Sequence, residues 1–530
     1  MQLRCRRMTG DGSPEQLGDD GGPAIPWLPP AAVLRRHGAR VLVPGLVSGL
    51  VPGEGGGAPT VYRAGVLLAD APPPLARCNR ALAPAGMRLD PQDRGRGKAR
   101  HGVHTIRLRP APGTDPEEID AWTALQALRA SGHGAGLSLD HLLFGAPMTE
   151  GSPLTEGSPL TEGSPLTEGS PLTEGSGGSR RPVDVILPAA PRRRTDAEIG
   201  DRRPIVAVLD TGIAPHAWLD VPATGQPLPA GGFTTIDAEL QDRIRAGHDA
   251  LIAAGYRLQR IDSAWERPVR TGSVTGALDS HIGHGTFIAG IVRQVAPDAT
   301  VLALRVMHSD GVVYESDLLT ALDHLADQVE AAQSGTGGRM VDVVCLSLGY
   351  YVEDAGDSRY TIRLETQVNR LLAAGVVVVA AAGNHATSRE FYPAALDLPG
   401  DLPVVSIGAF NPNDAKAMFS NDGPWVRYWA PGAALVSTFP AVQGSRGPAW
   451  TAPAGNAQGR PNRRESLDAD DFTRGFASWS GSSFSAALGA AEVAALLLDH
   501  AAADVTLRLD QLDAKSTGQR ALRALEAFPE

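Results

Sequence analysis

The segment that decides the fold reads Val376-Val377-Val378-Val379-Ala380-Ala381-Ala382-Gly383-Asn384, seven apolar residues followed by a glycine and a polar amide. A second run, residues 341–348, is almost as apolar. Strands that are apolar on both faces are typical of parallel sheets that helices cover on both sides. Such sheets carry their chemistry at the carboxyl ends of the strands, so functional residues are expected where these runs end.

Strand-like and helix-like runs alternate through the rest of the chain after residue 180. Besides the two runs above, they cover residues 205–209, 284–295, 300–306, 316–332, 360–374 and 404–408. This alternation predicts a doubly wound α/β domain with a mainly parallel sheet over residues 181–530.

A six-residue repeat separates this domain from the residues before it. Thr-Glu-Gly-Ser-Pro-Leu runs four times from Thr149 to Leu172, and more Gly and Ser residues follow it. A proline at every sixth position prevents a helix, and Gly and Ser leave little to pack. We therefore predict a flexible linker over residues 148–180.

Residues 61–147 form a second pattern of alternating runs. Strand-like runs lie at 61–68, 104–109 and 137–143, and helix-like runs lie at 73–85 and 116–130. The second helix has Thr114 and Asp115 as candidate caps and Pro116 in its first turn. The pattern predicts a small α+β domain of ferredoxin-like type, preceded by an irregular segment over residues 1–60.

Length and composition narrow the class of protein. A chain of 530 residues exceeds one hydrophobic core, and 42% hydrophobic residues suffice for more than one. The net charge of −11 favours a soluble protein and disfavours nucleic acid as a partner. Residues 1–30 hold no apolar run of signal-peptide length, so we expect a cytoplasmic protein without membrane contact.

The cysteines indicate neither a disulfide framework nor a zinc site. Cys5, Cys78 and Cys345 are the three in the sequence, and no two of them stand at metal-ligand spacing. We therefore expect no metal ligands among them.

Three segments place a reactive side chain beside a glycine or at the start of a helix. Asp210 ends the apolar run 206–209, His284 stands between two glycines, and Ser483 precedes the apolar helix 487–498. Each residue alone has a commoner explanation, because Asp and Ser often cap helices or turns and a lone His is often a satisfied core residue. Only their combination indicates catalysis.

Taken together, the chain order Asp210, His284, Ser483 and the residues around them resemble the subtilase family. Residues 345–349, 381–384, 419–424 and 429–432 resemble further stretches of that family in the same order. The resemblance covers about residues 204–500. It implies a subtilisin-like α/β fold and the hydrolysis of peptide bonds in proteins.

The resemblance also implies roles for single residues. Ser483 would be the nucleophile, His284 the general base, and Asp210 the group that orients the imidazole and stabilises its charged form. The amide of Asn384 and the backbone N–H of Ser483 would form the oxyanion hole. A serine hydroxyl is a poor nucleophile at neutral pH, which is why these neighbours are needed.

A substrate would bind, by the same resemblance, along the backbone of two strands. The walls of the primary specificity pocket would come from Ser347, Leu348 and Gly349 and from Ala381, Ala382 and Gly383, with a second pairing edge at Gly311, Val312 and Val313. An extended peptide adds to such edges with little sequence demand. The segment Phe391-Tyr392-Pro393 would replace the small residue that floors the pocket in relatives, so a bulky side chain before the scissile bond would fit poorly.

These residues predict a serine endopeptidase that cuts polypeptides through an acyl-enzyme intermediate. No cofactor is required, and the resemblance allows a structural calcium ion without identifying residues for it. Two alternatives remain open: a narrow-specificity cytoplasmic maturation or signalling peptidase, and a pseudopeptidase that only binds. The missing export signal and the long stretches 211–283 and 444–474 favour the narrow peptidase, with the second stretch as a lid or a partner-binding element.

The order of runs in residues 61–147 is similar to the small inhibitory prodomain of many subtilases. That resemblance implies one further strand near residues 86–89, where the sequence signal is weak. The resemblance also implies that residues 61–147 contact the peptidase domain, help its parallel sheet to fold and block its active site. A recognition or regulatory module is the alternative, because a long linker would separate a blocking tail from the active site. Arg180-Arg181 and Arg192-Arg193-Arg194 are candidate processing points, although basic runs are mostly solvated surface.

Overall fold

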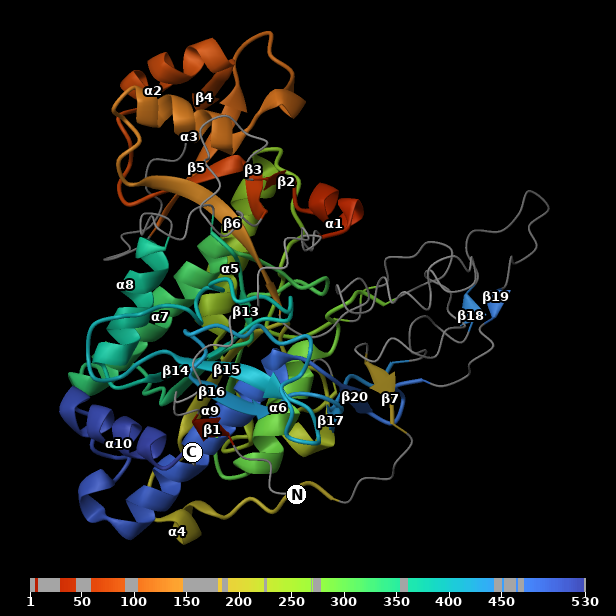
Figure 1. Cartoon of the computed structure of the whole chain (residues 1–530), viewed down its shortest axis with the longest axis vertical. Coiled ribbons are helices and arrows are strands. Elements are labelled where there is room, and N and C mark those ends of the chain that lie inside the picture. The colour runs from red at the N-terminus through yellow and green to blue at the C-terminus, as the bar shows by residue number, and fades with distance from the viewer. Residues whose placement is uncertain are drawn as a thin grey trace.

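The computed structural model holds two folded units, a smaller N-terminal one at one end of a larger domain (Figure 1). It describes residues 5–7, 29–43, 59–90, 103–145, 180–183, 189–223, 226–267, 269, 278–352, 361–442, 450–451, 464–465 and 471–528. The predicted linker lies outside the described residues except for Arg180.

The larger domain is built on an eight-stranded sheet of order β1-β16-β15-β14-β12-β8-β10-β9. Its strands are β1 (Arg6–Arg7), β8 (Ile205–Asp210), β9 (Thr234–Ile236), β10 (Thr300–Arg305), β12 (Val343–Leu346), β14 (Val377–Ala381), β15 (Val405–Phe410) and β16 (Tyr428–Pro431). Every pair is parallel except β1 with β16. β12 and β14 are buried along their whole length, as their apolar sequences require.

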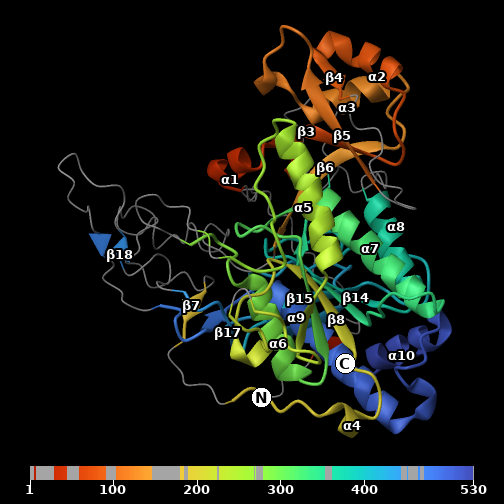
Figure 2. The ribbon, with the colours of Figure 1, turned by 180° about the vertical axis from the view of Figure 1, so that it is seen from behind.

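Helices cover both faces of this sheet, as the turned view shows (Figure 2). α6 (His284–Val295) and α9 (Ser482–Ala503) pack together on one face, and α5 (Ala238–Ala253), α7 (Glu315–Gln333) and α8 (Ile362–Ala373) lie on the other; α10 (Ala514–Glu526) contacts α9 and α8. α9 is long and apolar enough to cross a membrane, but most of it is buried against the sheet, as in a core helix. The predicted doubly wound, mainly parallel α/β fold is confirmed.

The N-terminal unit has the order strand, helix, strand, strand, helix, strand. Its elements are β3 (Thr60–Ala69), α2 (Leu75–Leu82), β4 (Met87–Leu89), β5 (His104–Pro110), α3 (Ala121–Ala130) and β6 (Leu137–Gly145). The strands form an antiparallel sheet, and α2 and α3 share a separate hydrophobic core with it. This is the ferredoxin-like arrangement, and the weak strand expected near 86–89 is present as β4.

Two expectations about this unit are wrong. Residues 1–60 are not irregular throughout, because α1 (Ala31–Arg36) and β2 (Ala39–Leu42) form within them, and β2 pairs with β3. Four residues are too few to show a periodicity, so only the pairing defines this strand. The second helix begins at Ala121 and not at Pro116, because Asp120 is extended and its side chain accepts the backbone N–H of Thr123 at 3.1 Å.

β6 connects the two units. Its first part pairs with β3, and its last residues pair with β11 (Val312–Tyr314) and β13 (Leu348–Gly349) of the larger domain. Figure 1 shows this long orange strand running from the N-terminal unit into the larger domain. α5 adds a second contact, because Arg107 donates to the carbonyl oxygen of Ala250 at its end (3.1 Å).

A small three-stranded sheet lies beside the main one. β20 (Phe476–Trp479) pairs with β17 (Leu435–Thr438) on one side and with β7 (Arg181–Pro182) on the other, in both cases antiparallel. β18 (Trp450–Thr451) pairs with β19 (Arg464–Glu465). Most of residues 444–474, for which a lid was predicted, lies outside the described residues.

Candidate active site

The three side chains that the sequence singled out lie at the end of a strand and at the starts of two helices that pack together. Asp210 is the last residue of β8, His284 the first residue of α6, and Ser483 the second residue of α9. Both carboxylate oxygens of Asp210 face Nδ1 of His284, at 2.8 and 2.9 Å. All three side chains are buried, so the hydrogen bonds of Asp210 to His284 lie in a medium less polar than water.

The two glycines beside His284 are required by close packing. Gly283 adopts a left-handed conformation (φ +86°), and a Cβ atom there would lie 2.1 Å from the ring of Phe439. A Cβ atom on Gly285 would lie 2.4 Å from the carbonyl oxygen of Gly212. The glycines therefore let the start of α6 approach the end of β8, which brings the imidazole to Asp210.

No hydrogen bond joins the hydroxyl of Ser483 to the imidazole of His284 among the described residues. The hydroxyl of Ser483 donates to the carbonyl oxygen of Ser347 at 3.2 Å, and the hydroxyl of Ser347 donates back to the carbonyl of Ser483 at 3.0 Å. Nε2 of His284 has no hydrogen-bond partner among the described residues. The aromatic rings of Phe484 and Trp479 lie 5.4 and 5.7 Å from the imidazole and exclude water from its faces.

Asn384 follows β14 and is fixed against the start of α9. Its Oδ1 accepts the backbone N–H of Ser482 at 2.9 Å, while the backbone N–H of Gly383 donates to the hydroxyl of Ser482 at 3.0 Å. Because the amide oxygen of Asn384 faces the N–H of Ser482, the NH₂ group of the same amide points away from that N–H. Asn384 and the first turn of α9 thus form one hydrogen-bonded unit.

The predicted pairing edges are both occupied by β6. Leu143 lies opposite Val313, Phe144 opposite Val312 and Gly349, and Gly145 opposite Leu348. The backbone N–H of Gly145 also donates to the carbonyl oxygen of Gly311 at 3.0 Å. The two edges therefore accept an extended chain between them, in antiparallel pairing on both sides.

Phe391 fills the space between the two predicted pocket walls. A Cβ atom added to Gly349 would lie 2.3 Å from its ring, and one added to Gly383 would lie 3.1 Å from it. Ala381 ends β14, and the carbonyl of Ala382 next to it accepts the side chain of Asn421 at 2.8 Å. The walls are thus separated by an aromatic ring and not by open space.

Sequence reasoning missed Glu266, a buried carboxylate behind the histidine. Its Oε1 accepts the backbone N–H of Gly283 at 2.6 Å, and its Oε2 accepts the hydroxyl of Thr286 at 2.8 Å. Burial raises its pKa to about 7, although the hydrogen bonds from Gly283 and Thr286 oppose that shift. No local pattern marks it, because it stands among other acidic residues in the long stretch between Asp210 and His284.

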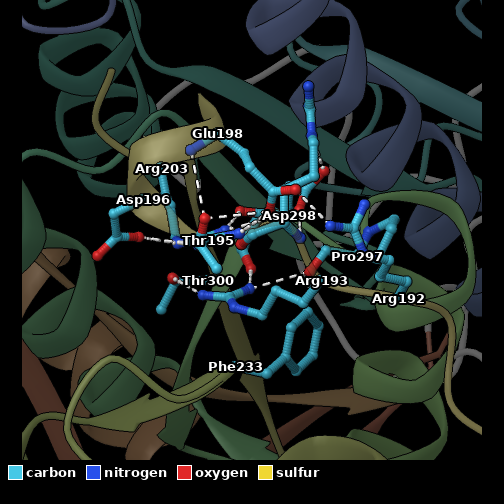
Figure 3. Close-up of polar contacts among 12 residues, drawn as sticks. Arg192, Arg193, Thr195, Asp196, Glu198, Arg203, Phe233, Pro297, Asp298 and Thr300 are labelled. Atoms are coloured by element: carbon cyan, nitrogen blue, oxygen red, sulfur yellow. Dashed lines mark hydrogen bonds and ion pairs between the residues drawn. The ribbon is translucent and has the colours of Figure 1, made fainter. Parts of the chain in front are cut away.

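The two basic runs that were candidate processing points have different surroundings. Figure 3 shows Arg193 beside Pro297 and Thr300, and Arg193 donates to the carbonyl of Pro297 at 3.0 Å. Arg194 donates to the carboxylate of Asp298 at 2.7 Å. Arg193 and Arg194 therefore anchor the chain to the larger domain, and both are only partly exposed. Arg180 lies near the histidine instead, as described below.

No metal site accompanies these residues within the described part of the chain, where no group of three or more His, Cys, Asp or Glu side chains is arranged around a common point. His281 lies close to the imidazole of His284, with 5.9 Å between the ring centroids. Burial and the charge of His284 lower the pKa of His281 to about 3, so this second ring is neutral at pH 7.

Comparisons with known proteins assign the chain to a family. The model of the subtilase family matches residues 201–517, more than half of the chain. The chain therefore belongs to the subtilase family.

Thermitase of Thermoactinomyces vulgaris is 33% identical over 213 residues, which cover 36% of this chain and 68% of thermitase. The thermophilic serine proteinase of Bacillus sp. strain AK1 is 36% identical over 166 residues, 29% of this chain and 36% of that protein. This chain spans 54% of subtilisin DY of Bacillus licheniformis, at 33% identity. A solved lanthipeptide protease aligns over 62% of this chain and 91% of its own length, with 17% identity and a TM-score of 0.38.

Proposed function

We propose that this chain is a serine endopeptidase whose triad is Ser483, His284 and Asp210. The observation that carries the proposal is the contact of both Asp210 oxygens with Nδ1 of His284, at 2.8 and 2.9 Å. That contact keeps the proton on Nδ1, so Nε2 is the nitrogen that accepts one. Ser483 lies in the first turn of α9, the helix that packs against α6, whose first residue is His284.

The reaction would begin when the Ser483 hydroxyl exchanges the carbonyl of Ser347 for Nε2 of His284. As Oγ attacks the substrate carbonyl, its proton passes to Nε2, and Asp210 stabilises the imidazolium. The NH₂ group of Asn384 and the N–H of Ser483 would donate to the oxyanion. His284 then gives the proton to the leaving amine, and a water molecule, deprotonated by the same nitrogen, hydrolyses the acyl-enzyme.

The N-terminal unit would regulate this activity and assist folding. β6 fills both pairing edges in antiparallel fashion, the arrangement that an extended substrate would adopt. A preformed unit that delivers a strand to β11 and β13 would also bring together parts of a parallel sheet that otherwise forms slowly. The intact chain is then an inhibited form, and polypeptide substrates compete with β6.

A narrow specificity is the second candidate, and Phe391 favours it. Because its ring lies between Gly349 and Gly383, only a small side chain before the scissile bond would fit there. Such a peptidase would act on few partners, as a maturation or signalling enzyme does. A pseudopeptidase would have the same fold without the reaction.

Labelling with a serine-directed fluorophosphonate tests the proposal. After cleavage within the linker repeat, the wild type should react and hydrolyse peptides, whereas Ser483→Ala should not react and should lose about five to six orders of magnitude in turnover. Ser485→Ala is the matched control, since it removes a hydroxyl on the same helix that donates to the carbonyl of Ala430. If the wild type neither reacts nor hydrolyses any peptide of a mixed library, the proposed reaction is wrong and the chain is a pseudopeptidase that only binds.

A further inference from the structure

Arg180, the residue that precedes β7, lies against residues that flank the proposed catalytic histidine. One of its guanidinium nitrogens donates to the carbonyl oxygen of Asp279 at 2.7 Å, and another donates to the carbonyl oxygen of Ser280. The guanidinium carbon lies 5.5 Å from the centre of the Trp479 ring. We call these two carbonyls and this ring the arginine subsite.

The arginine subsite adjoins the catalytic base on two sides. Trp479 is the last residue of β20, and its ring lies 5.7 Å from the ring of His284. Ser280 is followed by His281, whose ring lies 5.9 Å from the same imidazole. A group held in the arginine subsite is therefore a close neighbour of the reacting atoms.

The chemistry of the arginine subsite suits a guanidinium group. Two successive carbonyl oxygens match the planar fork of an arginine, which can donate to both at once, while a lysine would offer a point charge. An aromatic face attracts a cation as well. The neighbouring Arg181 is exposed, so its charge is not what holds β7.

Chain direction decides on which side of the scissile bond the arginine subsite lies. β6 runs toward Ser483, because its last residue, Gly145, lies opposite Leu348, and the carbonyl of the preceding Ser347 accepts the Ser483 hydroxyl. β20 also runs toward Ser483, and β7 is antiparallel to it, so β7 runs away from Ser483. β6 and β7 thus have the directions of a substrate before and after its scissile bond.

We propose that the arginine subsite binds an arginine side chain of the substrate on the leaving-group side, and that Arg180 fills it in the intact chain. The inference rests on the proposed peptidase function, which it deepens by naming a substrate class. The preferred substrates are proteins with an arginine shortly after the scissile bond. The intact chain therefore holds its own residues on both sides of the catalytic serine.

Binding to an inactive chain tests this proposal without relying on catalysis. The full chain with Ser483→Ala and Arg180→Ala is titrated by calorimetry with capped peptides that carry one arginine at each of four successive positions. At one position, replacement of arginine by citrulline, which has the same shape but no charge, should weaken binding about tenfold or more. The same peptide should bind the chain that retains Arg180 at least about tenfold more weakly, since Arg180 competes.

Arg181→Ala is the matched control, because it removes an equal charge one residue away. Combined with Ser483→Ala, it should leave the affinity for the arginine peptide as low as in Ser483→Ala alone. Equal affinity for the arginine and citrulline peptides at every position, no measurable binding, or an equal gain from Arg181→Ala would overturn the proposal. Fluorophosphonate labelling of the wild type decides the peptidase function separately, so the two failures are distinguishable.

Discussion

β6 and β7 both pair with strands beside the proposed active site, but different contacts hold them there. β6 pairs through its backbone with β11 on one side and β13 on the other, and it continues into a folded unit with its own core. β7 pairs over only two residues, and the side chain of Arg180 supplies further contacts. The acyl side thus relies on main-chain pairing, which tolerates many sequences, and the leaving-group side on one charged side chain.

Side chains strengthen the position of β6 without facing the proposed catalytic residues. Asp140 accepts the backbone N–H of Ser316 at 3.0 Å and pairs with Arg63 at 2.9 Å. His141 contacts Glu315 through Nδ1 and donates its backbone N–H to the same carboxylate at 3.2 Å. Because these groups are buried, separating β6 from α7 would break the hydrogen bonds to Ser316 and Glu315 in the interior, and the contact is expected to be tight.

Separating the N-terminal unit from the larger domain should give the largest effect. If one hexapeptide repeat is replaced by a recognition site for a specific protease, cleavage turns the tethered β6 into a separate inhibitor. Dilution to nanomolar concentration should then raise peptide hydrolysis by on the order of a hundredfold or more, because the tether no longer maintains a high local concentration. Progress curves with a quenched fluorescent peptide measure the increase.

Two controls accompany this cleavage experiment. The chain without the inserted site should show no increase after the same protease treatment, and the cleaved Ser483→Ala chain should stay inactive. Equal activity before and after cleavage at every concentration would mean that β6 does not restrict the access of peptides to the proposed active site. The role given to β6 in the comparison with β7 would then be wrong.

The sequence predicted the larger domain well because its signals are local. The apolar runs that became β12 and β14 identify buried parallel strands without any knowledge of their partners. Asp210 at a strand end and His284 between glycines mark positions that the topology then brings to 2.8 Å. Motif order along the chain was enough to pair residues that no periodicity connects.

The contacts of β6 and Arg180 with the larger domain left weaker signals. Leu143 and Val313 pair although a linker and several elements separate them along the chain, so the local sequence around one does not predict the other as its partner. Arg180 looked like an ordinary member of a basic run, and its ring and carbonyl partners are known only from the fold. Glu266 differs from nearby acids only in its burial, which tertiary packing decides.

Replacing Phe391 tests which side chains the proposed active site accepts before the scissile bond. Phe391→Ala removes the ring that lies against Gly349 and Gly383, and it should shift the preferred residue before the scissile bond from small to bulky by about ten- to a hundredfold in kcat/KM. The preference for arginine after the bond should be unchanged. A library varied at both positions, assayed on the cleaved chain, measures the two preferences together; a variant that still rejects bulky residues would contradict the role of Phe391.

Glu266 contacts Gly283 and Thr286 beside His284 and lies in neither β6 nor β7. Its replacement should therefore change stability and leave the preferences for substrate residues before and after the scissile bond unchanged. Its folded pKa is about 7, above the usual 4.5, so the folded state holds the extra proton between these values. Stability therefore falls as the pH rises from 4.5 to 7, by on the order of 3 kcal/mol in full. Glu266→Gln should lose this slope while it keeps an acceptor for Gly283.

Melting temperatures of the Ser483→Ala chain at pH 5 and pH 7.5, with and without Glu266→Gln, measure this smallest effect. The chain that retains Glu266 should melt at a lower temperature at pH 7.5 than at pH 5. Glu266→Gln should reduce this difference in melting temperature. Glu239→Gln, at an exposed position on α5, is the control and should leave the difference unchanged. An equal slope with and without Glu266→Gln would show that this carboxyl is already ionised at pH 5, and that its hydrogen bonds outweigh its burial.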